Sequence, residues 1–173
     1  MRHETQVDDI RHFMRELGLA VREEGRVYFT GGVSAVLHGW REMTIDIDLR
    51  ADPEPAGFFE ALRSLKEKLE INLELAAPSD FIPELLGWRD RSVLIARHGQ
   101  LDFFHYDFYS QALSKIERGH DRDLDDVRHM LGAGLIDPIK LGECFEQIRP
   151  VLLRYPAIDP DAFARKVFAF TRK

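Results

Sequence analysis

The chain has little cysteine and no cluster of metal-binding soft ligands. Its single cysteine, Cys144, cannot form a disulfide within the chain, which fits a reducing cytoplasm. The seven histidines show no His-x-x-x-His or His/Cys spacing, so the sequence gives no sign of a zinc site. We therefore predict that Cys144 is a buried apolar residue and that His38 and His105 are ordinary residues at the edge of the core.

Long apolar runs and an excess of basic residues are also missing. No run approaches the roughly 20 residues of a membrane span, and the N-terminus lacks the apolar core of a signal peptide. We expect a cytoplasmic protein without a membrane partner. The chain has 24 Lys and Arg against 30 Asp and Glu, a net charge of -6. Affinity for a phosphate backbone comes mostly from Lys and Arg, so general DNA binding is not expected, although a local basic patch remains open.

The residues that are present suit one domain of mixed α/β structure with a helical appendage. Of the 173 residues, 45% are hydrophobic, which is enough for a core. Helical spacing and capping signals predict helices over 5–23, 32–38, 56–69, 107–118, 123–133, 138–153 and 160–171. Alternating apolar residues predict strands over 27–30, 44–49, 71–75, 93–97 and 101–105. The predicted fold class is α/β (α+β): a mixed sheet flanked by helices over 1–106, and a helical region over 107–173 that packs on it as one compact unit.

The predicted strand 44–49 carries two carboxylates. Side chains alternate between the faces of a strand, so Asp46 and Asp48 point one way and the apolar residues Ile45, Ile47 and Leu49 point the other. Two carboxylates side by side repel one another unless a cation lies between them. The natural occupant is a hard, oxygen-binding ion such as Mg²⁺.

A glycine-rich turn precedes this strand in the sequence. Gly31-Gly32-Val33-Ser34 lies between an apolar strand and a short predicted helix, which Gly39 is expected to end. Such a turn presents backbone N–H groups to an anion, typically phosphate. A phosphate-binding turn next to a metal-binding carboxylate pair indicates nucleoside triphosphate chemistry.

These two motifs resemble the signature of the nucleotidyltransferase superfamily that includes DNA polymerase β. The stretch from Gly31-Gly32 through Gly39 to Thr44-Ile45-Asp46-Ile47-Asp48-Leu49 is similar to the minimal bacterial nucleotidyltransferases, some of which are toxins of abortive-infection (type IV toxin–antitoxin) systems. Residues 112–118 and 122–127 resemble the Lys…Arg…Arg-Asp-x-x-Asp segment of that toxin-like branch. The resemblance covers about residues 27–131.

The resemblance implies transfer of a nucleoside monophosphate from an NTP to an acceptor, with Mg²⁺ or Mn²⁺ as cofactor. Asp46 and Asp48 would bind the metal ions, and the Gly31 and Gly32 amides with the Ser34 hydroxyl would hold the β- and γ-phosphates. The acceptor would be a tRNA end, a protein or a small molecule, and an antitoxin partner is implied for a toxin.

The chain departs from the family pattern at one arginine. Many relatives carry an Arg two residues before the Thr, whereas here Glu42 occupies that position and Arg41 precedes it. Arg41 is therefore a candidate phosphate ligand from a shifted position.

A third carboxylate is usual in the superfamily, on a later strand of the same sheet. Glu74, in the alternating strand 71–75, is the first candidate to complete the metal site or act as a base. The alternative is that Glu74 is a surface residue. Asp102 is a competing candidate, although its strand face is shared with Phe104 and Tyr106.

The helical region carries a second charged cluster. Lys115 and Arg118 lie three residues apart, on the side away from the apolar stripe. Asp123 and Asp126 on the next predicted helix are also three residues apart. The toxin-like branch implies that Lys115 contacts the triphosphate and that an aspartate, Asp123 first, orients it or approaches the metal ions. The alternative is an ion-paired face between two antiparallel helices.

Two other functions remain open from the sequence alone. The chain could be a nucleotidyltransferase-fold binding module without transfer activity, or a helical interaction protein that acts through residues 107–171. Both motif carboxylates and Ser34 are present, which favours the enzyme.

Overall fold

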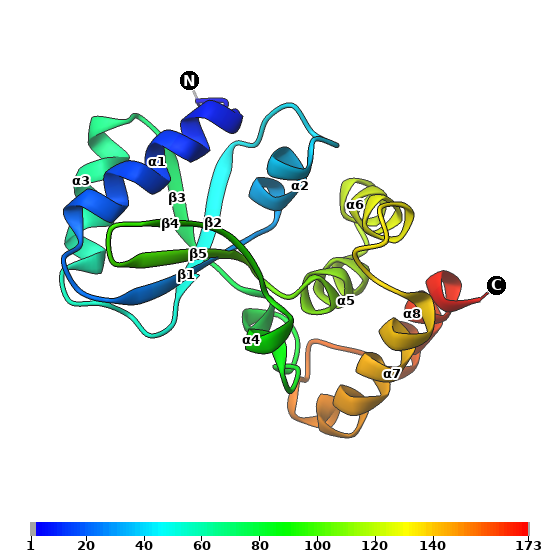
Figure 1. Cartoon of the computed structure of the whole chain (residues 1–173). Helices are drawn as coiled ribbons and strands as arrows, with labels where there is room; N and C mark the ends of the chain where they lie inside the picture. Colours follow the sequence, from blue (N-terminus) through cyan, green and yellow to red (C-terminus); the bar gives the residue numbers. More distant parts are fainter. Residues whose placement is uncertain (1–2, 173) are drawn as a thin grey trace. The chain divides into compact units, whose positions relative to one another are not determined.

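The computed structural model describes residues 3–172, which divide into two compact units (Figure 1). The α/β unit contains the chain up to Ala77 together with Ser92–Tyr106. The helical unit contains Pro78–Arg91 and the chain from Asp107 onward. The predicted α/β fold class, a mixed sheet flanked by helices with a helical C-terminal region, is confirmed.

A five-stranded mixed sheet forms the frame of the α/β unit, in the order β3-β2-β1-β5-β4. All five predicted strands are present, with ends shifted by up to two residues: β1 Gly25–Thr30, β2 Asp46–Ala51, β3 Asn72–Leu75, β4 Val93–His98 and β5 Leu101–His105. Strand β1 is antiparallel to β2 and parallel to β5, β2 is parallel to β3, and β4 and β5 form the predicted hairpin.

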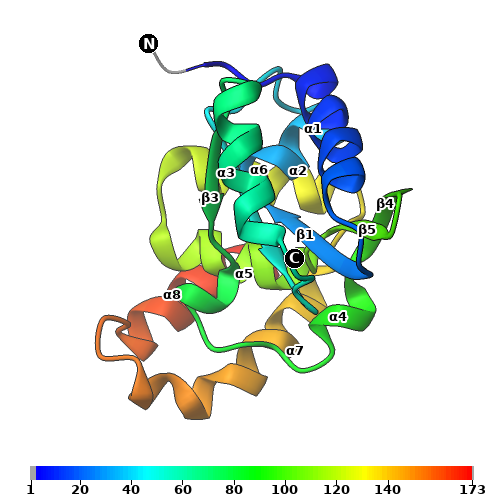
Figure 2. The same ribbon diagram turned by 90° about the vertical axis from the view of Figure 1, so that its left-hand side faces the viewer.

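Three helices pack on the sheet in this unit: α1 (Val7–Ala20), α2 (Gly32–His38) and α3 (Phe58–Lys68). Helices α1 and α3 contact each other, and both views show them adjacent (Figures 1 and 2). The core that they share with the sheet includes Phe13, Phe29, Ile47, Leu49, Leu62 and Phe103. Because Ile47 and Leu49 point into this core, the alternate residues of β2 point to the opposite face of the sheet.

The helical unit contains four longer helices and a short segment from earlier in the chain. Its elements are η1 Pro78–Asp80, α4 Trp88–Arg91, α5 Phe108–Arg118, α6 Asp121–Gly132, α7 Pro138–Ile148, η2 Arg149–Arg154 and α8 Pro160–Thr171. Asp137 and Asp159 cap α7 and α8 with side-chain hydrogen bonds, as their Asp-Pro sequences predict. The helix predicted to run to residue 153 ends instead at Ile148, because Pro150 has no backbone N–H to continue it.

A buried ion pair explains why residues 78–91 belong to the helical unit. Arg91, at the end of α4, donates hydrogen bonds from Nε and Nη2 to the two carboxylate oxygens of Asp107, at 3.1 and 2.8 Å. Asp107 also accepts hydrogen bonds from the backbone N–H groups of Tyr109 and Ser110, which caps α5. One fully buried carboxylate thus connects α4 to the start of α5.

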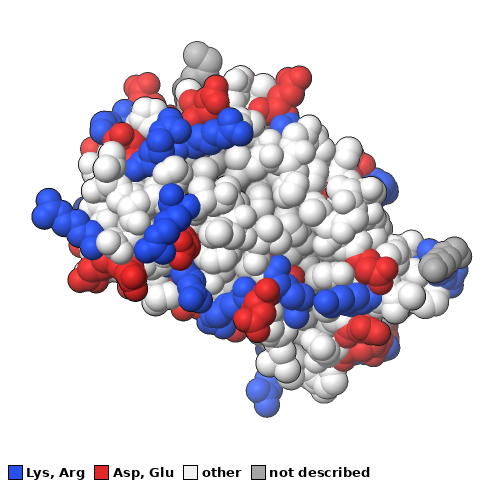
Figure 3. Space-filling model, viewed as in Figure 1, with Lys and Arg blue, Asp and Glu red and all other residues white. Residues whose placement is uncertain are grey.

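The surface carries both signs of charge. On the face in Figure 3, blue Lys and Arg atoms are mixed with red Asp and Glu atoms. The described residues of that face include no broad area of blue alone. Among the helices of residues 3–172, none has the length and apolar character that crossing a membrane requires. Cys144 is buried as predicted, and burial raises the pKa of its thiol.

Candidate functional site

The carboxylate pair of the sequence motif lies on one face of β2. Asp46 and Asp48 are partly exposed, and they alternate with the fully buried Ile47 and Leu49. Their Cα atoms are about 7 Å apart, the spacing of alternate residues in a strand. The predicted alternation of polar and apolar side chains along this strand is confirmed.

Gly31 brings the turn after β1 close to Asp48. The φ of Gly31 is 65°, a left-handed conformation that residues with a Cβ rarely adopt. A Cβ on Gly31 would also come within 2.7 Å of Oδ2 of Asp48. The backbone conformation and the nearby carboxylate therefore both require glycine at this position, and they put the turn next to the strand carboxylate.

Gly32, the first residue of α2, lies against the segment that leads into β2. A Cβ on Gly32 would clash with Oγ1 of Thr44 and would lie 3.5 Å from Nη1 of Arg41. The Arg41 guanidinium is thus beside the glycine turn. The Thr44 hydroxyl donates a hydrogen bond to the backbone carbonyl of Asp46, at 3.1 Å. Thr44 was not a predicted site residue, and its position directly before Ile45-Asp46 is the signal that could have identified it.

Ser34 lies in the first turn of α2 and is fully buried. Its Oγ is hydrogen-bonded to Nδ1 of His105, at 2.9 Å. The His105 ring in turn lies 4.6 Å from the ring of His38, which stacks on Trp40. Direct contact between Ser34 and a phosphate remains a prediction, and its burial against His105 favours a supporting role behind the turn.

Both histidines of this cluster are held in the neutral form. Burial, with a smaller contribution from the neighbouring His38, lowers the pKa of His105 to about 3. Burial also lowers the pKa of His38. Sequence reasoning treated both as ordinary residues, because nothing in the chain connects position 105 with a serine 71 residues earlier.

The two candidates for the third carboxylate lie in different places on the sheet. Glu74 is directly opposite Asp48 in the parallel pair of β2 and β3. Opposed residues of neighbouring strands point to the same face, about 5 Å apart. Asp102 lies near the other end of β1, roughly 13 Å along the strand, and accepts two hydrogen bonds from Arg97. The register therefore favours Glu74 over Asp102.

The strand carboxylates fit a metal site that the substrate completes. Among residues 3–172, no three His, Cys, Asp or Glu side chains lie close enough together to hold a metal ion by themselves. Mg²⁺ that acts on nucleotides is usually bound by one or two carboxylates, with water and phosphate oxygens as the other ligands. Asp46 and Asp48, partly exposed on a single face, match that donor set.

The charged cluster of the helical unit is a buried ion-pair network. Lys115 Nζ lies 2.7 Å from Oδ2 of Asp126 and 3.5 Å from Oδ1 of Asp123. Arg118 also binds Asp123, at 2.9 Å. The Lys115 side chain is only 5% exposed, so its expected place on the side away from the apolar stripe is wrong. Its position at the edge of the α5 stripe lets the ammonium group reach α6, as the ion-paired alternative supposed. Contact of Lys115 with a triphosphate, and a role for Asp123 in orienting it or approaching the metal ions, remain predictions.

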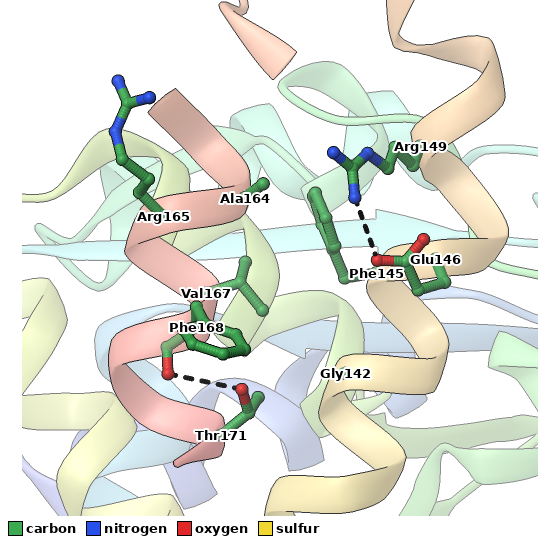
Figure 4. Close-up of a pocket in the computed structure, with 9 residues that line it drawn as sticks. All are labelled: Gly142, Phe145, Glu146, Arg149, Ala164, Arg165, Val167, Phe168 and Thr171. Atoms are coloured by element: carbon green, nitrogen blue, oxygen red, sulfur yellow. Dashed lines mark hydrogen bonds and ion pairs between the residues drawn. The ribbon is translucent and has the colours of Figure 1, made fainter. Parts of the chain in front are cut away.

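The helical unit also has a groove between α7 and α8, with a cavity of about 310 Å³. Figure 4 shows Phe145, Val167 and Phe168 pointing into it, and Arg149 and Arg165 at one end. Arg149 is paired with Glu146 at 3.3 Å. The groove is mostly apolar, unlike the polar site of the α/β unit.

A carboxylate pair on a strand, beside a glycine turn that ends the neighbouring strand, is the arrangement of a nucleotidyltransferase. Comparison with family models agrees with this class. The chain belongs to the family described as "nucleotidyltransferase of unknown function (DUF6036)", whose model matches residues 8–159. Comparison with curated proteins and with solved structures gave no significant match.

Proposed function

We propose that this protein is a Mg²⁺- or Mn²⁺-dependent nucleotidyltransferase that moves a nucleoside monophosphate from an NTP to an acceptor. One observation carries the proposal: the Gly31 turn lies against Asp48, and Asp48 shares a strand face with Asp46. A site for phosphate and a site for its metal ion are thereby adjacent. Family membership independently supports the class of reaction.

In the proposed reaction an oxygen of the acceptor attacks the α-phosphorus of the NTP. The bond from that phosphorus to the bridging oxygen breaks, and pyrophosphate leaves with the oxygen. Asp46 and Asp48 would hold divalent ions, which would supply positive charge to the phosphates and make the acceptor oxygen more nucleophilic. Glu74, opposite Asp48, adds a ligand or takes the proton that the acceptor oxygen loses.

The phosphates are proposed to lie on the Gly31–Gly32 turn. The backbone N–H groups of the two glycines can approach phosphate oxygens closely because no Cβ stands in the way. The Arg41 guanidinium, beside Gly32, adds a positive charge at the same turn. Ser34 contributes from behind the turn, where it is bonded to His105.

Lys115 is proposed as a further triphosphate ligand, and Asp123 as the residue that orients it or approaches the metal ions, only in so far as they leave their present pairing. The ammonium group of Lys115 is bound by Asp126 at 2.7 Å, so a phosphate would have to compete with that carboxylate. Lys115→Ala separates the two roles. If Lys115 binds the triphosphate, the substitution should raise the Michaelis constant for the NTP more than it lowers the melting temperature. If Lys115 is structural, the substitution should change the melting temperature alone.

The acceptor is proposed to be a tRNA end, a protein or a small molecule. A net charge of -6 disfavours long nucleic acid, because its binding depends on a broad basic surface, and the face in Figure 3 carries mixed charge. The similarity to toxin-like nucleotidyltransferases adds the proposal that this chain is a toxin with an antitoxin partner, acting in the cytoplasm. Growth arrest on expression, lost in Asp46→Asn, would support that role.

Titration calorimetry of the full chain with each NTP tests nucleotide binding at this site. We expect binding with Mg²⁺ present and none with excess EDTA, because the strand carboxylates repel a bare triphosphate. Asp48→Asn should weaken Mg²⁺-dependent binding, and Asp102→Asn is the matched control on the same sheet. Equal effects of the two substitutions would contradict the proposed position of the site.

The second candidate is a nucleotidyltransferase-fold module that binds a nucleotide or a protein without transfer. The observation in its favour is the shifted Arg41. It predicts NTP binding without release of pyrophosphate. An assay of nucleoside monophosphate transfer and pyrophosphate release distinguishes this module from the enzyme.

A further inference from the structure

We propose that His105 is a positioning residue that holds the Gly31–Gly32 turn against Asp48, acting through Ser34. The inference rests on the proposed function, because the turn matters for catalysis only if it binds the nucleotide. The proposed role of His105 is to position the turn, and it requires no contact of His105 with the metal ions or the phosphates.

His105 lies beside the end of β1, although it belongs to the neighbouring strand β5. It is the last residue of β5, and it is opposite Phe29 in the parallel pair of β1 and β5, one residue before β1 ends. From there its ring reaches both turns of α2. Nδ1 is bonded to Ser34 Oγ at 2.9 Å, and the ring lies 4.6 Å from that of His38.

Helix α2 depends on such contacts because it is short. It has seven residues, and its N-cap residue, Gly31, has no side chain to accept a capping hydrogen bond. Isolated helices of this length are not stable in water, so packing has to fix the orientation of α2. Ser34 and His38 are four residues apart and therefore share a face. His105 contacts both of them and so ties the whole helix, and the turn that begins it, to the end of β5.

A histidine suits this position better than an apolar residue. The Ser34 hydroxyl is buried, and a buried hydroxyl is costly unless it is hydrogen-bonded. Burial lowers the pKa of His105 to about 3, so the ring stays neutral and offers a hydrogen bond without placing a charge in the core. Leucine could fill much of the same space but would remove this bond.

The experiment compares five forms of the full chain by hydrogen–deuterium exchange without ligand. The forms are wild type, Ser34→Ala, His105→Leu, the Ser34→Ala/His105→Leu double variant, and His105→Asn, which keeps a polar group near the place of Nδ1. Leu62→Ala in α3 is the matched control, since it removes buried contacts of the same core away from α2. The dissociation constant of Mg²⁺-ATP, with the other NTPs in parallel, is then measured for each form.

We expect Ser34→Ala and His105→Leu each to raise exchange selectively over residues 31–38, by about tenfold, the effect of losing one hydrogen bond. NTP binding should weaken by a similar factor. The double variant should be no worse than His105→Leu alone, because the bond between Ser34 and His105 is already lost in that variant. His105→Asn should recover part of the loss, and Leu62→Ala should show no selective rise over residues 31–38.

Three results separate this inference from the proposed function. Exchange that rises evenly across the α/β unit in His105→Leu and Ser34→Ala would overturn the inference and make His105 an ordinary core residue. Selective exchange with unchanged NTP affinity would also overturn it. A wild-type protein that binds no NTP would instead contradict the proposed function, and the exchange data would still decide whether His105 fixes the turn.

Discussion

Carboxylates occupy opposite environments in the two units of this protein. In the helical unit, Asp107 and Asp126 are almost fully buried, and each is bonded to a cation of the same unit, Arg91 or Lys115. In the α/β unit, Asp46 and Asp48 stay partly exposed on one strand face, next to a turn that cannot tolerate a side chain. The carboxylates of the helical unit already have a cation of the same unit as partner. The carboxylates of the α/β unit have the geometry of a site that a cation from solution would complete.

The comparison separates carboxylates that stabilise the fold from carboxylates for which we propose a chemical role. A buried carboxylate that loses its cation leaves an uncompensated charge in the core, so the fold depends on it. Like charges side by side on a strand destabilise the protein slightly when no ion is bound, so the fold gains nothing from them. Substitution to asparagine should therefore affect activity in the α/β unit and stability in the helical unit.

The largest effect is expected for activity in the α/β unit. Asp46→Asn with Asp48→Asn should reduce NMP transfer by at least about a thousandfold, or about 4 kcal/mol in activation free energy, because the metal ions lose their protein ligands. The free energy of unfolding should stay within about 0.5 kcal/mol of wild type, or rise, because a repulsion is removed. Initial rates and urea unfolding measure the two quantities. A large loss of stability would mean that these carboxylates are structural.

The matched change in the helical unit is Asp126→Asn. It should lower the free energy of unfolding by about 3 kcal/mol, because Lys115 is then buried without the carboxylate 2.7 Å away. Lys115→Met with Asp126→Leu should recover most of that loss, since an apolar pair of similar size needs no counter-charge. Urea unfolding of the three forms is the measurement, and a loss below about 0.5 kcal/mol for Asp126→Asn would remove the contrast between the units.

Gly31→Ala should separate backbone strain from crowding of the site. Gly39 is the control, since its φ is also positive, at 86°, but a Cβ there would meet nothing within 4 Å. Gly39→Ala should lower stability by about 1 kcal/mol through strain alone. Gly31→Ala should lower it by about 2 kcal/mol and also weaken Mg²⁺-dependent NTP binding, because its Cβ meets Asp48. Equal binding by both variants would contradict the proposed phosphate position.

The smallest effect concerns the pH dependence of stability. The pKa of His105 is about 3 in the folded chain and about 6.5 when exposed, so below pH 6.5 the unfolded chain binds a proton that the folded chain does not. The free energy of unfolding should therefore fall as pH falls through this range, and His105 should account for about 1.4 kcal/mol of the loss between pH 7.5 and 5.5. His105→Asn should remove that part of the slope in urea unfolding. An unchanged slope would contradict a lowered pKa of His105 in the folded protein.

Local sequence signals predicted much of the fold. The bounds of α2 and α8 match the predicted ranges, because Gly39 adopts the left-handed conformation that ends one helix and Asp159-Pro160 begins the other. Alternation identified the buried and polar faces of β2 because one face of that strand packs in the core. The end of α7 was missed because apolar spacing continued past Pro150, where the backbone could not.

The site was predictable only where its residues are close in sequence. The glycine turn and the strand aspartates form a short motif, and the motif carried the hypothesis of a nucleotidyltransferase. The bond between Ser34 and His105 joins residues 71 positions apart, and no periodicity reveals it. The burial of Lys115 was missed because Lys115 was placed on the side of its helix away from the apolar stripe, whereas two aspartates of the next helix allow it to be buried.

Transfer of labelled nucleoside monophosphate is the most direct test of the central claim. Wild-type protein would be incubated with Mg²⁺, each α-labelled NTP in turn, and a cell extract that contains RNA, protein and small molecules, beside the Asp46→Asn/Asp48→Asn variant. The account predicts that label enters one class of acceptor with wild type alone, only with divalent metal, and with release of pyrophosphate. Absence of transfer by wild type with every NTP, or equal transfer by the variant, would contradict it.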